Sequence, residues 1–292
     1  MSEQLSFTVP PDCDGMAAKT FLRWRCGIST RMITRLKREK DGILMDGKNL
    51  RTVDPISSGS VITVTLPEEE MSIEPVKGAL NIVFEDAHLL ALNKPPFMPV
   101  HPVKQHQTDT LANRVAYYAA QRGEDYVFRA QNRLDRNTAG LVLVCKDRFC
   151  INKLKGAVEK TYLALVHGRV ERQGRVDLPI ALRDGSKIVR CTSPDGKPAV
   201  THYRPLSVFD DISLIELKLE TGRTHQIRCH MSSIGHPLLG DDLYGGSPEL
   251  ISRQALHCAE MRFVHPVTGE TVSLNVMMPD DMQAVIDISN KE

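Results

Sequence analysis

Strand patterns outnumber helical ones along this chain and so restrict the architectures open to it. The clearest lies between Ile212 and Glu220, where Ile215, Leu217 and Leu219 alternate with charged residues. A period of two is typical of a strand with one buried face. The other predicted strands cover residues 61–66, 82–84, 89–92, 141–144, 161–166, 200–208, 255–264 and 271–277. Because strands are many and helices few, we expect an α+β fold with a central, mostly antiparallel sheet.

Helices are predicted at only a few places. In the larger part of the chain, one follows Thr108 or Asp109 and ends at Gly123, a second begins at Asp147, and a third covers residues 280–288. Ser, Thr or Asp just before a helix accepts hydrogen bonds from its first backbone N–H groups. The same signal, Ser29 or Thr30, predicts a helix over residues 28–36.

The N-terminal part of the chain is predicted to be a separate domain. Pro67 and the acidic run Glu68–Glu70 are typical of a linker and place a boundary near residues 67–78. We therefore predict domains at residues 1–70 and 79–292.

The formal net charge of the chain is only +1, from 37 basic and 36 acidic residues. Such a balance argues against a nucleic-acid partner, but it hides how the charges are distributed. Residues 19–40 contain eight Lys and Arg and a single acid, Glu39, for a local charge of +7. A basic cluster of this kind is typical of nucleic-acid binding.

Composition excludes several classes of protein. Hydrophobic residues make up 41% of the chain and charged residues 25%, as in globular proteins with a core. No apolar run approaches the roughly 18 residues of a membrane-spanning helix. The chain has seven cysteines, an odd number, and they are spread widely along it. Its N-terminal residues show no export signal. We therefore expect reduced thiols and a cytoplasmic protein.

A polar segment, Asn132 to Gly140, precedes the buried strand at 141–144. Within it, Asp135 is flanked by Arg133 and Arg136, whose charges favour the ionised carboxylate. A fixed carboxylate can act as a nucleophile or a general base. A structural ion pair is the more common explanation of such residues, so the segment alone does not establish a catalytic role.

Two further segments carry chemistry-bearing side chains. Residues 160–165 form a strand with one aromatic residue, Tyr162, and a strand Tyr is usually a core residue. Residues 221–230 concentrate Arg223, His225, Arg228 and His230, with no acidic residue among them. This cluster favours an anionic ligand, either a phosphate or a fixed carboxylate.

No motif supports a metal or a nucleotide cofactor. His225, Cys229 and His230 cluster, as do His257 and Cys258, but neither group has C-x-x-C or H-E-x-x-H spacing. The Gly-rich phosphate-binding motifs and the G-x-S-x-G of serine hydrolases are absent. We therefore expect no metal and no cofactor.

Together and in this order, the three segments resemble the RluA family of pseudouridine synthases. The motifs that match are Arg133-Leu134-Asp135 with Thr138-x-Gly140, Lys160-x-Tyr162-Leu-Ala-Leu, and Gly222-Arg223-Thr-His-Gln-Ile-Arg228-x-His230. Further matches are Asn93-Lys94-Pro95, Val100-His101-Pro102, Gly196-Lys197-x-Ala199-x-Thr201 and Gly235-His236-Pro237-Leu-x-Gly240-Asp241-x-x-Tyr244-Gly245. The basic N-terminal segment resembles a divergent S4-type RNA-binding domain.

The resemblance implies a pseudouridine synthase fold with a small S4-like N-terminal domain. It also implies that the protein isomerises uridine to pseudouridine in a structured ribosomal or transfer RNA. The N-glycosidic bond breaks, the uracil rotates, and C5 rejoins C1′ after the uridine has been flipped out of the RNA stack. We expect a monomer that binds RNA, without a membrane partner or a nucleotide cofactor.

Roles for individual residues follow from the same resemblance. Asp135 would be the essential carboxylate, either attacking C1′ or assisting proton removal at C2′. Arg228 would pair with Asp135, because its planar fork suits a carboxylate. Tyr162 would stack on the uracil and take part in proton transfer. The implied substrate-binding residues are Arg133, Leu134, Arg136, Lys160, Arg223, Thr224, His225, Gln226 and His230.

The chain departs from the family pattern at two positions of the loop. The family usually has His at the position of Asn132 and Ser at that of Ala139. Asp135 itself is kept, so activity is expected. Two alternatives remain: a non-catalytic RNA-binding protein with the same fold, and a glycosidase or nucleosidase. The latter typically uses a carboxylate pair, and no second acid accompanies Asp135 in its loop.

Overall fold

The computed structural model describes residues 4–65, 73–124 and 126–289. The chain divides into two compact units, Met1–Glu70 and Met71–Glu292, and each has a hydrophobic core of its own. The predicted linker at residues 67–78 lies partly outside the described residues.

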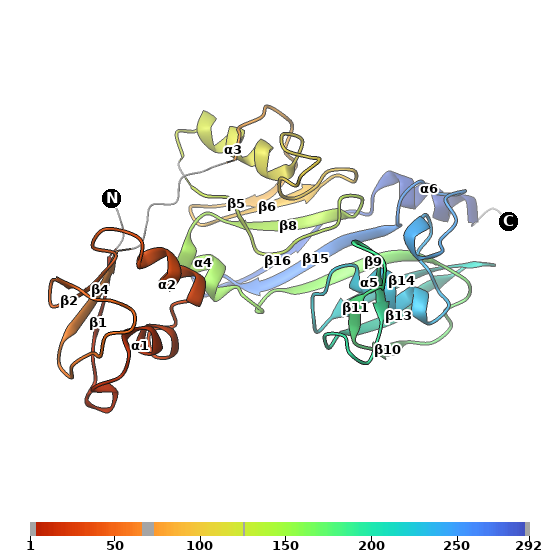
Figure 1. The fold of residues 1–292 in the computed structure, drawn as a ribbon. Helices are drawn as coiled ribbons and strands as arrows, with labels where there is room; N and C mark the ends of the chain where they lie inside the picture. Colours follow the sequence, from red (N-terminus) through yellow and green to blue (C-terminus); the bar gives the residue numbers. More distant parts are fainter. Residues whose placement is uncertain (1–3, 66–72, 125, 290–292) are drawn as a thin grey trace. The chain divides into compact units, whose positions relative to one another are not determined.

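The first unit is a small antiparallel sheet packed against two short helices (Figure 1). Its strands, in the order β1-β4-β2-β3, are β1 (Gln4–Thr8), β4 (Val61–Thr65), β2 (Ile43–Met45) and β3 (Lys48–Asn49). After a 3-10 turn, η1 (Pro11–Cys13), come α1 (Ala18–Trp24) and α2 (Thr30–Leu36). Ser29 caps α2, as predicted, because its Oγ accepts a hydrogen bond from the Met32 amide at 3.2 Å. Helix α1 has no clear signal in the sequence.

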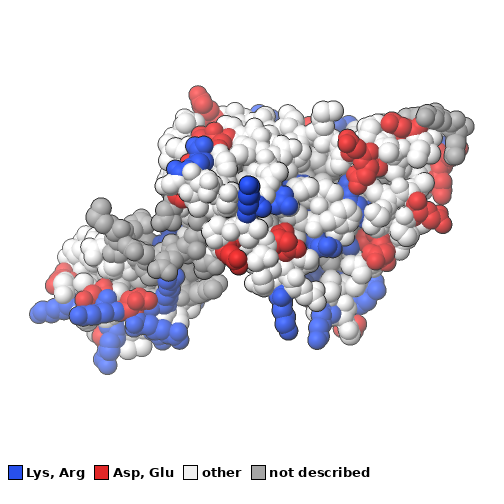
Figure 2. Space-filling view, turned by 90° about the horizontal axis from the view of Figure 1, so that it is seen from above, with Lys and Arg blue, Asp and Glu red and all other residues white. Residues whose placement is uncertain are grey.

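Charge is distributed unevenly between the two units. On the face seen in Figure 2, Lys and Arg outnumber Asp and Glu over the first unit, whereas both signs are interspersed over the second. Within the basic segment 19–40, Arg25 pairs with Asp12. The exposed basic side chains of this segment also include Lys19, Arg23, Arg35, Lys37, Arg38 and Lys40.

The second unit is built on a ten-stranded sheet that spans the unit (Figure 1). Its main path follows the order β10-β13-β14-β9-β15-β8-β6-β5, with β16 beside β15 and β7 beside β8. These strands are β5 (Ile82–Glu85), β6 (Leu89–Lys94), β7 (Arg129–Ala130), β8 (Ala139–Cys145), β9 (Glu159–His167), β10 (Gly174–Asp177), β13 (Val200–Val208), β14 (Ile212–Leu219), β15 (Leu256–Val264) and β16 (Thr271–Asn275). Within the described residues only β8 and β15 pair in parallel, so the prediction of a mostly antiparallel sheet in an α+β fold is confirmed.

In the second unit, the strands that the pattern did not predict are short. Apart from β7 and β10, they include β11 (Ile180–Leu182) and β12 (Arg190–Thr192), which form a separate two-stranded ribbon. Each has only two to four residues, too few for an alternating pattern to develop. Pairing with partners elsewhere in the chain makes these segments strands.

The helices of the second unit are α3 (Leu111–Gln121), α4 (Arg148–Lys153), α5 (Gln226–Ser233) and α6 (Asp280–Ser289), with a 3-10 turn, η2 (Asp242–Tyr244). Asp147 caps α4 as predicted. The predicted cap of α3 was wrong: Thr110, and not Thr108 or Asp109, precedes this helix. Thr110 and Asn113 bind each other's backbone N–H reciprocally, which requires a polar side chain three residues into the helix. None of the helices in the described ranges is long and apolar enough to cross a membrane.

Candidate active site

Asp135 and Arg228 meet across 93 residues of sequence. Asp135 lies in the loop between β7 and β8, and Arg228 lies in the first turn of α5. Nη1 of Arg228 donates a hydrogen bond to Oδ2 of Asp135 at 3.0 Å, so the predicted pair is present. The arginine side chain is buried, whereas the Asp135 side chain is 27% exposed. The carboxylate is therefore held from the protein interior and remains accessible on its outer side.

A second carboxylate fixes the same arginine. Nε and Nη2 of Arg228 each donate to one oxygen of Asp241, both at 2.7 Å. Asp241 is completely buried. Although burial opposes the charged form, the hydrogen bonds and charges of Asp241 and Asp135 raise the pKa of Arg228 above its ordinary value. The guanidinium thus stays charged between the two carboxylates.

His225 approaches Asp135 from the N-cap position of α5. Its φ of 56° lies in the left-handed region, which is uncommon for a residue other than glycine. Its Nε2 lies 3.7 Å from Oδ2 of Asp135, and its Nδ1 lies 3.0 Å from the hydroxyl of Tyr244. That hydroxyl also accepts a hydrogen bond from the Arg190 amide at 2.8 Å, so its own proton can be donated to Nδ1. Burial lowers the pKa of His225, which favours the neutral ring.

Tyr244 contacts both partners of Asp135. Its ring lies edge-to-face with the His225 ring, with centroids 5.8 Å apart. The centre of the Arg228 guanidinium lies 5.0 Å from the Tyr244 ring centroid, close enough for a cation–π contact. Burial raises the pKa of Tyr244 to about 12, so its phenol remains protonated.

Two buried basic side chains hold the backbone just after Asp135. Nζ of Lys94 donates to three carbonyl oxygens, including that of Arg136 at 3.1 Å. Nη1 of Arg253 donates to the carbonyl of Asn137 at 3.3 Å. Burial, followed by the charge of Arg253, lowers the pKa of Lys94 to about 7. These contacts anchor the loop that carries the candidate carboxylate.

Tyr162 lies on β9 and is buried, with Cys258 opposite it on β15. Burial raises the pKa of Tyr162 well above its ordinary value, and the charges of Cys258 and Asp135 act in the same direction. The phenol is therefore protonated, and it lies within electrostatic range of Asp135.

The predicted substrate-binding residues fall into two groups. Arg133, Arg136, Arg223 and Thr224 are exposed, and Nε of Arg223 donates to the carbonyl of Pro198 at 3.0 Å. These four side chains are available to a bound polymer.

The others mainly bind groups of the protein itself. Leu134 belongs to the hydrophobic core, and the half-buried Lys160 donates to a backbone carbonyl at 3.0 Å. Nε2 of Gln226 donates to Oγ1 of Thr201 at 3.1 Å. Both ring nitrogens of the buried His230 have hydrogen-bond partners within the protein, and one of these partners is Thr201. These residues shape the site from inside.

Both departures from the family loop are buried. The Asn132 side chain donates to the Leu141 carbonyl and accepts from the Leu143 amide, each at 3.0 Å. Ala139 begins β8 and is 2% exposed. Asn132 therefore satisfies two backbone groups of β8.

Sequence reasoning assigned no role to Asp241, Tyr244 or Lys94. All three lie in motifs that match the family pattern, so a signal was present in the sequence. It did not reveal their partners, because those partners lie on distant segments of the chain.

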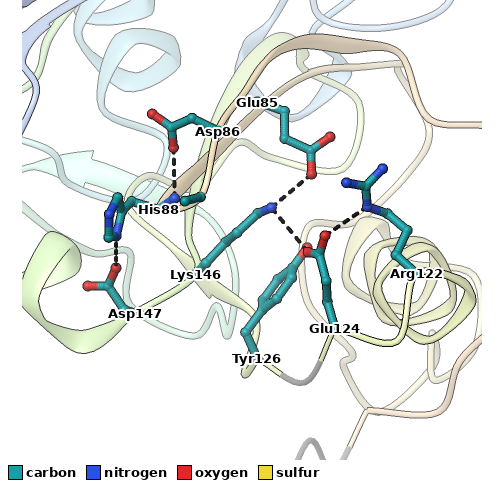
Figure 3. A pocket seen from close by; sticks show the side chains of 9 residues that line it. Glu85, Asp86, His88, Arg122, Glu124, Tyr126, Lys146 and Asp147 are labelled. Carbon is teal, nitrogen blue, oxygen red and sulfur yellow. Dashed lines mark hydrogen bonds and ion pairs between the residues drawn. The ribbon is translucent and has the colours of Figure 1, made fainter.

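A cavity of about 690 Å³ lies elsewhere in the second unit and contains none of the predicted site residues. Figure 3 shows its charged side chains turned towards one another, with Nζ of Lys146 bound to Glu85 at 2.8 Å and Glu124 at 3.1 Å. At its edge, His88 and Asp147, together with Cys150, offer three atoms that could ligate a metal. The His88 and Asp147 atoms already share a hydrogen bond of 2.9 Å.

Comparisons with known proteins agree with these motifs. A family model described as RNA pseudouridylate synthase matches residues 88–233. The uncharacterized RNA pseudouridine synthase YjbO of Bacillus subtilis (strain 168) is 39% identical over 274 residues, which cover 90% of this chain and 96% of that protein. Ribosomal large subunit pseudouridine synthase D of Zymomonas mobilis is 39% identical over 293 residues, which cover 89% of this chain and 92% of that protein.

Solved structures show the same relationship. The human RNA pseudouridylate synthase domain containing 1 has a TM-score of 0.58 and 27% sequence identity, with 71% of this chain and 86% of that one covered. The matched span of the family model includes Asp135, Tyr162 and Arg228. The chain belongs to the RNA pseudouridylate synthase family.

Proposed function

We propose that this protein converts uridine to pseudouridine at specific positions of ribosomal RNA, with Asp135 as the essential carboxylate. The observation that carries the proposal is the pair of Asp135 and Arg228, in which a buried, fixed arginine holds a partly exposed carboxylate. The large-subunit enzyme among the relatives favours ribosomal over transfer RNA as the substrate.

The geometry suits a reaction at the sugar of a flipped nucleotide. Among the described residues, Arg228 and His225 both approach Oδ2 of Asp135, which leaves Oδ1 for the substrate. That oxygen can attack C1′ or remove the proton at C2′, and both routes break the bond between N1 and C1′. After the uracil rotates, C5 bonds to C1′, and this step either releases the carboxylate from C1′ or is accompanied by return of the proton to C2′. The C5 proton then leaves, and N1 gains a proton. Tyr162 is protonated and 7% exposed, and by its match to the family's second motif it would stack on the uracil.

The remaining parts of the proposal concern the rest of the protein. The first unit, with its exposed basic segment, would act as an S4-like RNA-binding domain. We place the protein in the cytoplasm as a monomer, and the free state of all seven cysteines is in keeping with a reducing compartment.

Release of tritium from RNA labelled at uridine C5 tests the reaction. Large-subunit ribosomal RNA and transfer RNA, both lacking modifications, would serve as parallel substrates. The wild type should release tritium from the ribosomal RNA, and Asp135→Asn should abolish release while leaving RNA affinity largely intact. Asp242→Asn, at an exposed position, is the matched control and should stay active.

Incubating the protein with labelled RNA and with free nucleosides separates the alternatives. A non-catalytic RNA-binding protein would release no tritium from any RNA in its wild-type form. A nucleosidase would instead liberate free uracil from nucleosides. Wild-type release by Asp135→Asn would remove this residue from the mechanism.

A further inference from the structure

Trp24 is the only tryptophan of the chain, and it stands outside the core. It is the last residue of α1, and 71% of its surface is exposed. Phe21 and Leu22 of the same helix are buried, at 2% and 0% exposure. A large aromatic residue usually contributes to folding by burial, so its exposure here needs another reason.

The surroundings of Trp24 are cationic. The centre of the Arg23 guanidinium lies 4.9 Å from the Trp24 ring centroid, which is cation–π distance. The segment 19–40 around it carries a net charge of +7, and all its basic side chains whose exposure is described are exposed. The face of the first unit seen in Figure 2 shows this excess of Lys and Arg. An exposed ring among solvent-facing cations matches an anionic polymer that also offers flat, apolar groups.

We propose that Trp24 is a stacking platform for an unpaired base of the substrate RNA, with the neighbouring cations bound to the flanking phosphates. The inference rests on the proposed function, because it takes RNA as the substrate. Bases in a paired helix are stacked on each other, and only an unpaired base can present its face to an indole ring. Stacking on an aromatic side chain together with a basic surface is the general mode of single-strand recognition.

Because Trp24 is the only tryptophan, its fluorescence reports on this position directly in the full-length protein. The protein would be titrated with a single-stranded RNA and with a blunt duplex of equal length. We expect the single strand to quench the emission and to shield the ring from acrylamide. The duplex should do so far less at equal occupancy.

Substitutions then test whether the ring contributes to affinity. Trp24→Leu keeps an apolar side chain without a π face and should weaken binding of the single strand about 5- to 150-fold. Trp24→Phe should restore part of the loss. Val53→Ala, at another exposed apolar position of the same unit with 72% exposure, is the control and should bind like the wild type.

Three results would overturn the inference: no quenching by any RNA, equal quenching by strand and duplex, or wild-type affinity in Trp24→Leu. Unquenched fluorescence together with intact RNA affinity would show that the RNA binds away from Trp24. The outcome is independent of the isomerisation assay. Failure of the proposed function would show as no tritium release by the wild type, whereas failure of this inference would show only in the fluorescence of Trp24 and in the RNA affinity of its variants.

Discussion

Asp241, whose side chain is completely buried, accepts two hydrogen bonds of 2.7 Å from the guanidinium of Arg228. This pair orients the guanidinium so that its remaining edge faces Asp135 at 3.0 Å. Burying an ion pair costs desolvation free energy, so the pair of Asp241 and Arg228 serves to orient the guanidinium more than to stabilise the fold. The arrangement therefore fixes the candidate carboxylate through a residue that never touches the substrate.

Replacing Asp241 should lower the catalytic rate without removing the carboxylate. In Asp241→Asn the amide offers Arg228 only one acceptor, so the guanidinium can shift. We expect kcat for tritium release to fall about 100-fold, because small misplacements of reacting groups are costly. KM for RNA should change little.

The control for this prediction is the exposed neighbour Asp242→Asn, which removes the same charge at the next position. An unchanged kcat in Asp241→Asn, with the protein fully folded by circular dichroism, would show that Arg228 does not need its second carboxylate.

Tyr244→Phe should shift the acidic limb of the activity profile. The phenylalanine ring can keep the contact with Arg228, but it lacks the hydroxyl that binds Nδ1 of His225. That hydrogen bond favours the neutral ring, so its removal raises the pKa of His225. The acidic limb of tritium release should therefore move to higher pH in the variant.

A pH series from about 5 to 8 measures this effect, with Tyr203→Phe at a partly buried position of β13 as the control. A drop in rate that is uniform across the series would mean that Tyr244 acts through packing alone.

Stability should fall as the solution becomes acidic. Burial lowers the pKa of His101, His225, His230 and His257 in the folded protein. The unfolded chain then binds more protons as the pH falls through about 6.5, which favours unfolding. Urea denaturation should show a free energy of unfolding that decreases between about pH 7 and pH 5.

Direct measurement of protons taken up on unfolding in this window provides the check. Proton release, or stability that rises towards pH 5, would contradict the burial of neutral histidines. Carboxylates such as Glu216, whose pKa is lowered by Arg204, act in the same direction but only at lower pH.

Asn132→Ala should destabilise the second unit. The change leaves the Leu141 carbonyl and the Leu143 amide without their side-chain partner inside the protein. An unsatisfied buried polar group costs about 1–3 kcal/mol. The free energy of unfolding from urea titrations should fall by that order.

The matched substitution is Asn137→Ala in the same loop, whose buried side-chain oxygen has no hydrogen-bond partner among the described residues. It should cost less than Asn132→Ala. Equal losses would mean that the two backbone contacts contribute nothing.

Removing the first unit should weaken RNA binding and flatten its salt dependence. For every RNA phosphate that the protein no longer neutralises, the slope of log K against log salt falls by about 0.7–0.9. Binding isotherms for a chain lacking residues 1–70 would show this. Substituting Lys37, Arg38 and Lys40 by Gln in the full chain gives a milder change of the same sign, and an unchanged slope in both would reduce the basic segment to a solvated surface.

Local signals predicted the structure correctly where short-range chemistry decides it. The cap of α2 by Ser29 and the start of α4 at Asp147 depend only on residues within one turn. The cap of α3 was misplaced because Thr108, Asp109 and Thr110 are all acceptable caps, and the reciprocal bond with Asn113 decides between them. Strands β10 to β12 carry no pattern of their own, so their partners define them.

The sequence by itself determined the α+β class, through its strand pattern, and the family, through short motifs in a set order. The pair of Asp135 and Arg228 followed only from the resemblance to that family. Only the tertiary structure showed which residues hold that pair in place. Asp241 binds Arg228, Tyr244 contacts both His225 and Arg228, and Lys94 binds the backbone just after Asp135. The reason is physical. Spacing along a chain reports which side chains share a helix turn or a strand face, whereas contacts between distant segments exist only once the sheet has brought them together.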